Sequence, residues 1–89
     1  MDFEFDPAKS QSNKLKHGID FEAAQQLWGD SCGIEFDSQY VNEPRILRIG
    51  EAQDELWTAV FTRRGDKIRI ISVRRAREDE REKYADDNS

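Results

Sequence analysis

The stretch that decides the fold is LWTAVFTRRGDKIRIISV at residues 56–73, where two runs rich in β-branched and aromatic residues flank a short polar segment. Both runs, residues 56–62 and 67–73, have the composition of β-strands. Between them lies Arg64-Gly65-Asp66, in which the glycine can adopt the positive φ that a tight turn requires. The stretch therefore predicts a β-hairpin.

Weaker strand patterns precede this hairpin. Residues 45–49 are a good run, residues 33–36 are a weak one, and the polar residues 51–55 are predicted to form a loop. Consecutive strands with short connections predict an antiparallel meander. If the last strand keeps a strict period of two, its faces are Lys67, Arg69, Ile71 and Val73 on one side, and Ile68, Ile70, Ser72 and Arg74 on the other.

The N-terminal part predicts a strand followed by a helix. Residues 2–5 alternate as a half-buried strand does, and Asp6-Pro7 is typical of a helix start. We expect this helix to end at Lys16 or His17, because Gly18 can take the left-handed conformation that ends a helix.

Two further helices are predicted. Asp20 can cap a second helix, whose inward face repeats at helical spacing and stops at Gly29-Asp30. That face consists of Phe21, Ala24, Leu27 and Trp28. A last helix over residues 75–84 has strong helix formers but hardly any apolar face, so we expect it to be largely solvated. Residues 85–89 are expected to form a disordered tail.

Length and composition indicate one small α+β domain over residues 1–84, with an antiparallel sheet, two N-terminal helices and one C-terminal helix. The chain has 89 residues, of which 37% are charged, so its core must be thin. No apolar run is long enough to cross a bilayer, and no secretory signal is present at the N-terminus. The lone Cys32 cannot form an internal disulfide. We therefore expect a cytoplasmic protein.

The charge is unevenly distributed along the chain. The net charge is −5, yet residues 63–77 carry seven basic side chains and one acidic one, which makes this segment +6. Residues 1–62 sum to −7 and residues 78–89 to −4. A concentrated basic segment in an acidic chain is suited to a polyanion or to an acidic protein partner.

Few kinds of chemistry are open to this residue set. One His and one Cys do not make a zinc site, and phosphate-binding glycine loops are absent, so we expect no metal and no cofactor. RNA cleavage through the substrate's 2′-hydroxyl needs only a proton acceptor, an acid and cations near the phosphate. His17 suits proton transfer and arginine suits phosphate. Equally, His17 can serve a helix end, and the arginines can be ordinary surface charges.

Shorter motifs recur in an order that resembles one family, the BrnT toxins of bacterial toxin–antitoxin pairs. The match runs from residue 3 to about residue 84, Val73 stands where alanine is usual, and residues 30–45 follow the family poorly. The motifs are Phe3-Glu4-Phe5-Asp6-Pro7-Ala8-Lys9, Asn13, Lys16-His17-Gly18-Ile19, Phe21-Glu22-Ala23-Ala24, Arg64-Gly65-Asp66, Ile68-Arg69-Ile70-Ile71-Ser72, Arg74-Arg75-Ala76, Glu80-Arg81 and Tyr84.

The resemblance implies a RelE-like fold, a metal-independent endoribonuclease that inhibits translation, an RNA substrate on or off the ribosome, and a BrnA-like DNA-binding antitoxin. From these matches we ourselves assign the catalytic candidates, which are His17, Lys16, Arg64, Arg69 and Tyr84. The phosphate-binding candidates that we assign are Arg63, Arg64, Arg69, Arg74 and Arg75. Two alternatives stay open: a non-catalytic partner in a toxin–antitoxin repressor complex, and a toxin that acts on a protein.

Overall fold

The computed structural model describes residues 1–38 and 44–89 of the chain, so part of the region that departs from the family pattern, residues 39–43, lies outside the described residues. The order of elements is β1 (Asp2–Glu4), α1 (Pro7–His17), the 3-10 helix η1 (Ala23–Gly29), β2 (Ile34–Asp37), β3 (Ile46–Ala52), β4 (Glu55–Arg64), β5 (Lys67–Arg75) and α2 (Glu78–Asp87). The predicted α+β class is confirmed.

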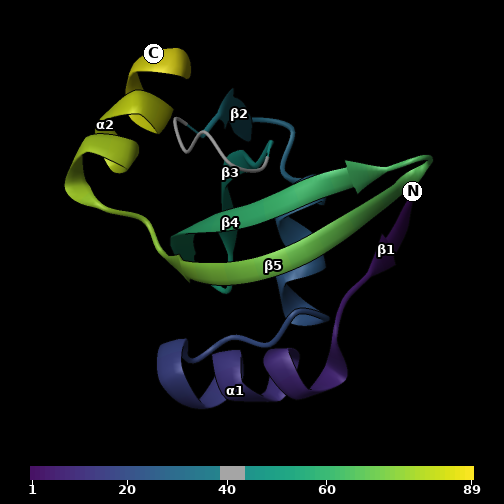
Figure 1. Cartoon of the computed structure of the whole chain (residues 1–89). Helices are drawn as coiled ribbons and strands as arrows, with labels where there is room; N and C mark the ends of the chain where they lie inside the picture. Colours follow the sequence, from purple (N-terminus) through teal and green to yellow (C-terminus); the bar gives the residue numbers. More distant parts are fainter. Residues whose placement is uncertain (39–43) are drawn as a thin grey trace.

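The strands form one five-stranded sheet in the order β1-β5-β4-β3-β2. Strands β2 to β5 make the antiparallel meander that the sequence predicts. The expectation of a wholly antiparallel sheet is wrong, because β1 pairs in parallel with the start of β5 (Figure 1). A parallel pair needs a long connection, and here residues 5–66 separate the two strands. The pairing places Phe3 beside Ile68 at the sheet edge.

The predicted loop at residues 51–55 is also wrong. Strand β3 continues to Ala52 and β4 begins at Glu55, which leaves a two-residue turn. Gln53 and Asp54 both have positive φ, 53° and 63°, as a type I′ hairpin turn requires. The predicted hairpin turn between β4 and β5 is confirmed, with Gly65 at a φ of +61°.

Strand β5 contains one extra residue, so the predicted two-residue alternation is wrong. Val60 pairs with Ser72, but the next residue of β4, Phe61, pairs with Ile70. Ile71 is left without a partner on β4, as in a β-bulge. Beyond this point the faces exchange, so Val73 joins Ile68 and Ile70 in the core instead of facing the same way as Arg69.

Helices cover the two faces of the sheet unequally. Helices α1 and η1 enclose the main core on one face (Figure 1), and the core's wholly or nearly wholly buried side chains include Phe21, Leu27, Trp57, Phe61 and Ile70. On the opposite face, α2 lies over only one end. There Thr58 and its partner across the strands, Ile49, are fully buried. No helix among residues 1–38 and 44–89 lies over the rest of this second face, which is called the open face below.

The second predicted helix is present, but it is a 3-10 helix and not an α-helix. Asp20 accepts a hydrogen bond from the backbone N–H of Ala23 at 2.7 Å, as its predicted capping role requires. The buried residues of this segment, Phe21, Ala24 and Leu27, are spaced by three, which is the repeat of a 3-10 helix. The helix lies so close to β3 that a Cβ on Gly50 would meet the Leu27 backbone oxygen at 3.1 Å.

Helix α1 is fastened to the free edge of β5 by one side chain. Strand β1 covers that edge only over residues 67–69. Beyond residue 69, the side-chain amide of Asn13 forms the backbone hydrogen bonds that a neighbouring strand would form with β5. Its Nδ2 donates to the Val73 carbonyl at 2.9 Å, and the Val73 N–H donates to its Oδ1 at 3.2 Å. Nδ2 also donates to the Ile19 carbonyl at 2.7 Å. One buried amide therefore satisfies three backbone groups.

Helix α2 begins at Glu78, three residues later than predicted, because β5 runs on to Arg75. It then continues to Asp87, through the segment that we expected to be a disordered tail, and the Asn88 side chain donates to the Tyr84 carbonyl at 2.7 Å. No helix within the described residues is long and apolar enough to span a membrane.

The role of Asn13 can be tested by truncation. We expect Asn13→Ala to lower the free energy of unfolding by about 2–4 kcal/mol, because three buried backbone groups lose their partner. The measurement is urea denaturation. Ser12→Ala, at an exposed neighbour on the same helix, is the control and should change stability by less than about 0.5 kcal/mol. Equal stability of the two variants would contradict this account.

Candidate functional site

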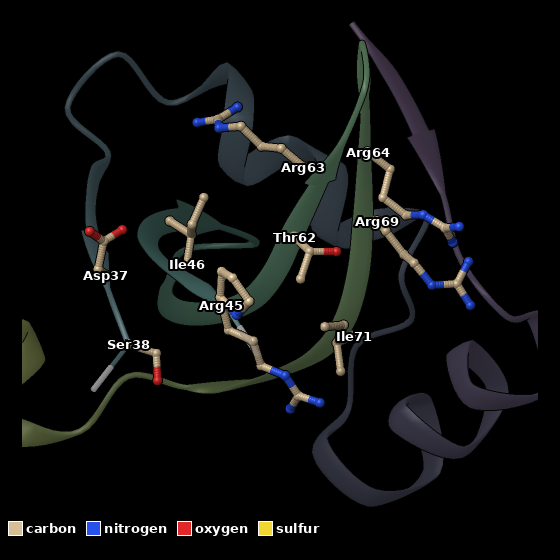
Figure 2. A pocket seen from close by; sticks show the side chains of 10 residues that line it. Asp37, Ser38, Arg45, Ile46, Thr62, Arg63, Arg64, Arg69 and Ile71 are labelled. Carbon is tan, nitrogen blue, oxygen red and sulfur yellow. The ribbon is translucent and has the colours of Figure 1, made fainter. Parts of the chain in front are cut away.

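The open face carries a wide hollow of about 760 Å³ beside the β4–β5 hairpin, called the groove below (Figure 2). Four of its lining residues are arginines, which come from three separate segments of the chain. The lining is Asp37, Ser38, Pro44, Arg45, Ile46, Thr62, Arg63, Arg64, Arg69 and Ile71. Such a surface attracts anions, and guanidinium groups match the geometry of phosphate.

Arg64 and Arg69 are the predicted site residues that the structure brings together. Figure 2 shows their guanidinium groups side by side, next to β1. Both face Glu4, whose Oε1 lies 3.6 Å from Nη1 of Arg64 and 3.9 Å from Nη1 of Arg69. These distances are too long for hydrogen bonds, and neither guanidinium has a hydrogen bond within the described part of the chain. Their N–H donors therefore remain available to an anion.

Arg45 is a groove residue that sequence reasoning missed. It directly precedes β3, and the sequence pattern of residues 45–49 indicates only the start of a strand there. Strand pairing across the sheet brings it to the groove, where its guanidinium and that of Arg69 lie on either side of Ile71 (Figure 2). No local signal in the sequence distinguishes it, because its position depends on how β3, β4 and β5 are aligned.

Arg63 lies at the margin of the groove. Its side chain extends to the other side of the hairpin from Arg64 and Arg69 (Figure 2). There it donates to Oε1 of Glu35 at 2.8 Å and lies over the ring of Phe61, on the core side of the sheet. Part of its charge is therefore already matched inside the protein.

Arg74 faces the same way as Arg69, but it holds α2 in place. Its Nη1 and Nη2 donate to the two carboxylate oxygens of Glu80 at 2.7 and 2.9 Å. Thr58 and the backbone N–H of Arg77 also donate to Glu80. Burial alone would raise the pKa of Glu80, but these hydrogen bonds outweigh it and lower the pKa to about 2. Arg74 is thus part of a buried network.

Arg75 lies outside the groove, although the sequence grouped it with the phosphate-binding candidates. Its guanidinium pairs with Glu55 at 3.0 Å and lies 5.6 Å from the ring centroid of Trp57. Trp57 belongs to the core face. Arg75 therefore faces away from Arg69.

Lys16 and His17 are not among the described residues that line the groove. Helix α1 starts beside the Arg69 end of β5, is fixed to Val73 through Asn13, and runs on for one more turn to His17 (Figure 1). The imidazole is therefore at the far end of β5 from Arg69. His17 is half-buried and Lys16 is exposed, and both lie in the last turn of the helix, where positive charge is favoured.

Tyr84 is also distant from the groove arginines. It lies on α2, and its hydroxyl donates to Oδ2 of Asp30 at 2.8 Å. Burial and this carboxylate raise the pKa of Tyr84 to about 12, so the phenol keeps its proton at neutral pH. The same contact, together with two backbone N–H donors, keeps the pKa of Asp30 below its usual value despite burial. Tyr84 thus joins α2 to the end of η1.

These features define a class: a small α+β protein with an arginine-lined groove on the open face of a mixed sheet. Comparison with protein families is more specific. Residues 5–80 match the family described as ribonuclease toxin, BrnT, of type II toxin–antitoxin systems, and the chain belongs to that family. A type II toxin has an antitoxin as its partner. A comparison with curated proteins finds no match.

The Glu80 network predicts a pH dependence of stability. Because the pKa of Glu80 is lower in the folded chain than its usual 4.5, its contribution is present above pH 4.5 and is lost as pH falls toward 2. We expect Glu80→Gln to cost about 3 kcal/mol at neutral pH, since Arg74 loses its buried partner. The variant should also lose this acid-dependent component of stability.

Urea denaturation at a series of pH values measures both effects. Glu82→Gln, at an exposed acid on the same helix, is the matched control and should keep the wild-type pH profile. A Glu80→Gln protein whose stability falls with acid as steeply as the wild type would show that another carboxylate is responsible.

Proposed function

We propose that this chain is an endoribonuclease that binds the RNA backbone in the groove, cleaves it without a metal ion and thereby inhibits translation. The observation that carries the proposal is the pair Arg64 and Arg69, whose side chains are 61% and 38% exposed and which keep free N–H donors beside each other. Family membership supports the ribonuclease activity, and the arginine-lined groove supports binding of the phosphate.

The proposed chemistry uses the 2′-hydroxyl of RNA as the nucleophile. The 2′-oxygen attacks the adjacent phosphorus and expels the 5′-oxygen, which leaves a 2′,3′-cyclic phosphate. The proton of the 2′-hydroxyl passes to water and the 5′-oxygen takes up a proton from water, while negative charge builds up on the non-bridging oxygens in the transition state. Guanidinium groups placed on these oxygens stabilise that charge more than the charge of the ground state. Arginine does not lose its proton in proteins, so Arg64 and Arg69 stabilise charge and do not act as bases.

The arrangement of helices and sheet also supports a RelE-like fold as part of this proposal. We further propose that the antitoxin is BrnA-like and inhibits the toxin by covering the groove. Residues 63–77 are the concentrated basic segment of an acidic chain, and an acidic part of a partner would be attracted to them. An antitoxin in this position would exclude RNA.

Arg69→Ala tests the phosphate site. We expect RNA cleavage to fall by about a hundredfold, because a charge contact in the transition state is lost. RNA binding should weaken, and the slope of log affinity against log salt should decrease by about 0.7, because fewer counterions are released. Cleavage is measured on purified RNA and on ribosome-bound mRNA, both in the presence of chelator.

Arg81→Ala is the matched control, because it removes the same charge from an exposed position on α2.

His17→Ala tests whether the imidazole takes part in cleavage. From its position we expect cleavage to be nearly unchanged and stability to fall by about 0.3–1 kcal/mol. A loss of cleavage of about a hundredfold in His17→Ala would instead assign proton transfer to the imidazole. Full cleavage activity of Arg69→Ala would mean that the RNA binds outside the groove.

The position of the antitoxin can be tested by hydrogen exchange. When the complex forms, amide exchange should slow most strongly at the β4–β5 hairpin and in α2, that is, over residues 63–84. Slowing that is confined to α1 and η1 would contradict inhibition by covering the groove.

One observation favours a second function, that of a non-catalytic partner in a toxin–antitoxin repressor complex. General bases in enzymes are most often His, Asp or Glu. Among the described groove residues Asp37 is the one side chain of these types, and it is turned away from Arg64 and Arg69 (Figure 2). Expression of the chain without its antitoxin separates the two functions. Growth arrest with RNA cleavage supports the nuclease, and normal growth supports the binding partner.

A further inference from the structure

A second hollow lies beside the groove on the open face, between the sheet and α2. Its volume is about 330 Å³, at the lower end of the roughly 300–1,000 Å³ usual for small-molecule sites. It shares Ser38 and Arg45 with the groove, so the two hollows adjoin. Figure 2 shows both of these residues on the side of the groove away from Arg64 and Arg69.

The two hollows differ in chemistry. Both hollows have basic side chains in their lining, and those of the second hollow are Arg45, Arg74, Arg77 and Lys83. The second hollow adds apolar walls from half-buried Phe36, Leu47 and Val60. The Lys83 ammonium lies 4.6 Å from the ring centroid of Phe36, and both residues line this hollow. An aromatic ring and aliphatic side chains beside a proposed phosphate site can pack against the faces of a base that is covalently linked to that phosphate.

Two carboxylates line the second hollow, and one of them forms no hydrogen bond or ion pair with the described residues. Both oxygens of Glu80 already accept hydrogen bonds from Arg74, and one of them also accepts from Thr58 and from the Arg77 N–H. Asp79, the adjacent residue of α2, also lines the hollow and forms no hydrogen bond or ion pair within residues 1–38 and 44–89. The hollow therefore contains an acceptor for ligand N–H groups.

We propose that this second hollow is a nucleobase subsite of the RNA groove, in which Asp79 selects guanine. The inference rests on the proposed function, because the groove must hold the phosphate of the same RNA. Guanine is the base whose Watson–Crick edge offers two adjacent N–H donors, N1–H and N2–H, to the two oxygens of a carboxylate. Adenine and cytosine offer one amino group each, and uracil offers one ring N–H.

The geometry of the two hollows makes Asp79 a specificity residue and not a catalytic one. Its carboxylate belongs to α2 and lines the second hollow, but it does not line the groove that holds Arg64 and Arg69. It would therefore contact the base and not the reacting phosphate. Its removal should therefore change which RNA binds, while the salt dependence due to Arg64 and Arg69 stays the same.

The test uses short oligonucleotides with 2′-fluoro sugars, which lack the attacking hydroxyl and so cannot be cleaved. Four uridine-rich oligonucleotides differ at one position, which is G, A, C or U, and binding is measured by fluorescence anisotropy. We expect the wild type to bind the G oligonucleotide at least about fivefold more tightly than the others, the lower range for a two-bond base contact. Asp79→Asn should lose this preference and keep its salt dependence.

Glu82→Gln is the matched control, since it removes the same charge from an exposed position of the same helix and should keep the preference for G. Circular dichroism establishes that both variants are folded. Equal binding of all four oligonucleotides by the wild type, or a preference that survives Asp79→Asn, overturns the subsite and leaves the RNA groove intact. Failure of the wild type to bind any of them overturns both.

Discussion

The single unmatched residue in β5 determines what each face of the sheet presents. A strand that shifts by one residue exchanges its two faces, and the extra Ile71 produces this exchange halfway along β5. As a result Val73 is buried in the core, while Ser72 and Arg74 face the same side as Arg69. Asn13 then binds the backbone of Val73, just beyond the bulge, which secures the changed register. The core and the groove both depend on this irregularity.

The two faces of the sheet are stabilised by different interactions. The helix-covered face has an ordinary apolar core that includes three edge-to-face aromatic pairs. Helix α2 has no comparable apolar stripe, and its fixed points are the polar contacts of Glu80 and Tyr84. Acidic side chains at the margins, Glu4 and Glu35, are paired with the basic segment. The exposed guanidinium groups of Arg64 and Arg69 nevertheless leave a local cationic surface on an acidic chain.

Sequence reasoning found the features that short segments determine. The β4–β5 hairpin follows from its composition and Gly65, and helix α1 follows from Asp6-Pro7 and Gly18, with the cap hydrogen bond from the Ala8 N–H to Asp6 at 2.9 Å. The basic segment was also visible, because charge can be summed without a fold.

What it missed depends on contacts between distant segments. The parallel position of β1, the bulge and the 3-10 form of η1 arise from packing against other elements, which override local preference. In the same way, pairing across the sheet brings Arg45 into the groove and Arg75 onto the opposite face. The arginines of the basic segment, residues 63–77, are therefore divided between the groove and other parts of the surface.

The parallel pairing of β1 and β5 also fixes when the groove can form during synthesis. Glu4 leaves the ribosome among the first residues, but Arg64 and Arg69 follow only after about sixty more, and the chain grows from its N-terminus. Strand β1 can pair only after β5 has been synthesised, and until then the edge of the sheet at β1 is incomplete. The cationic groove is thus a late product of translation.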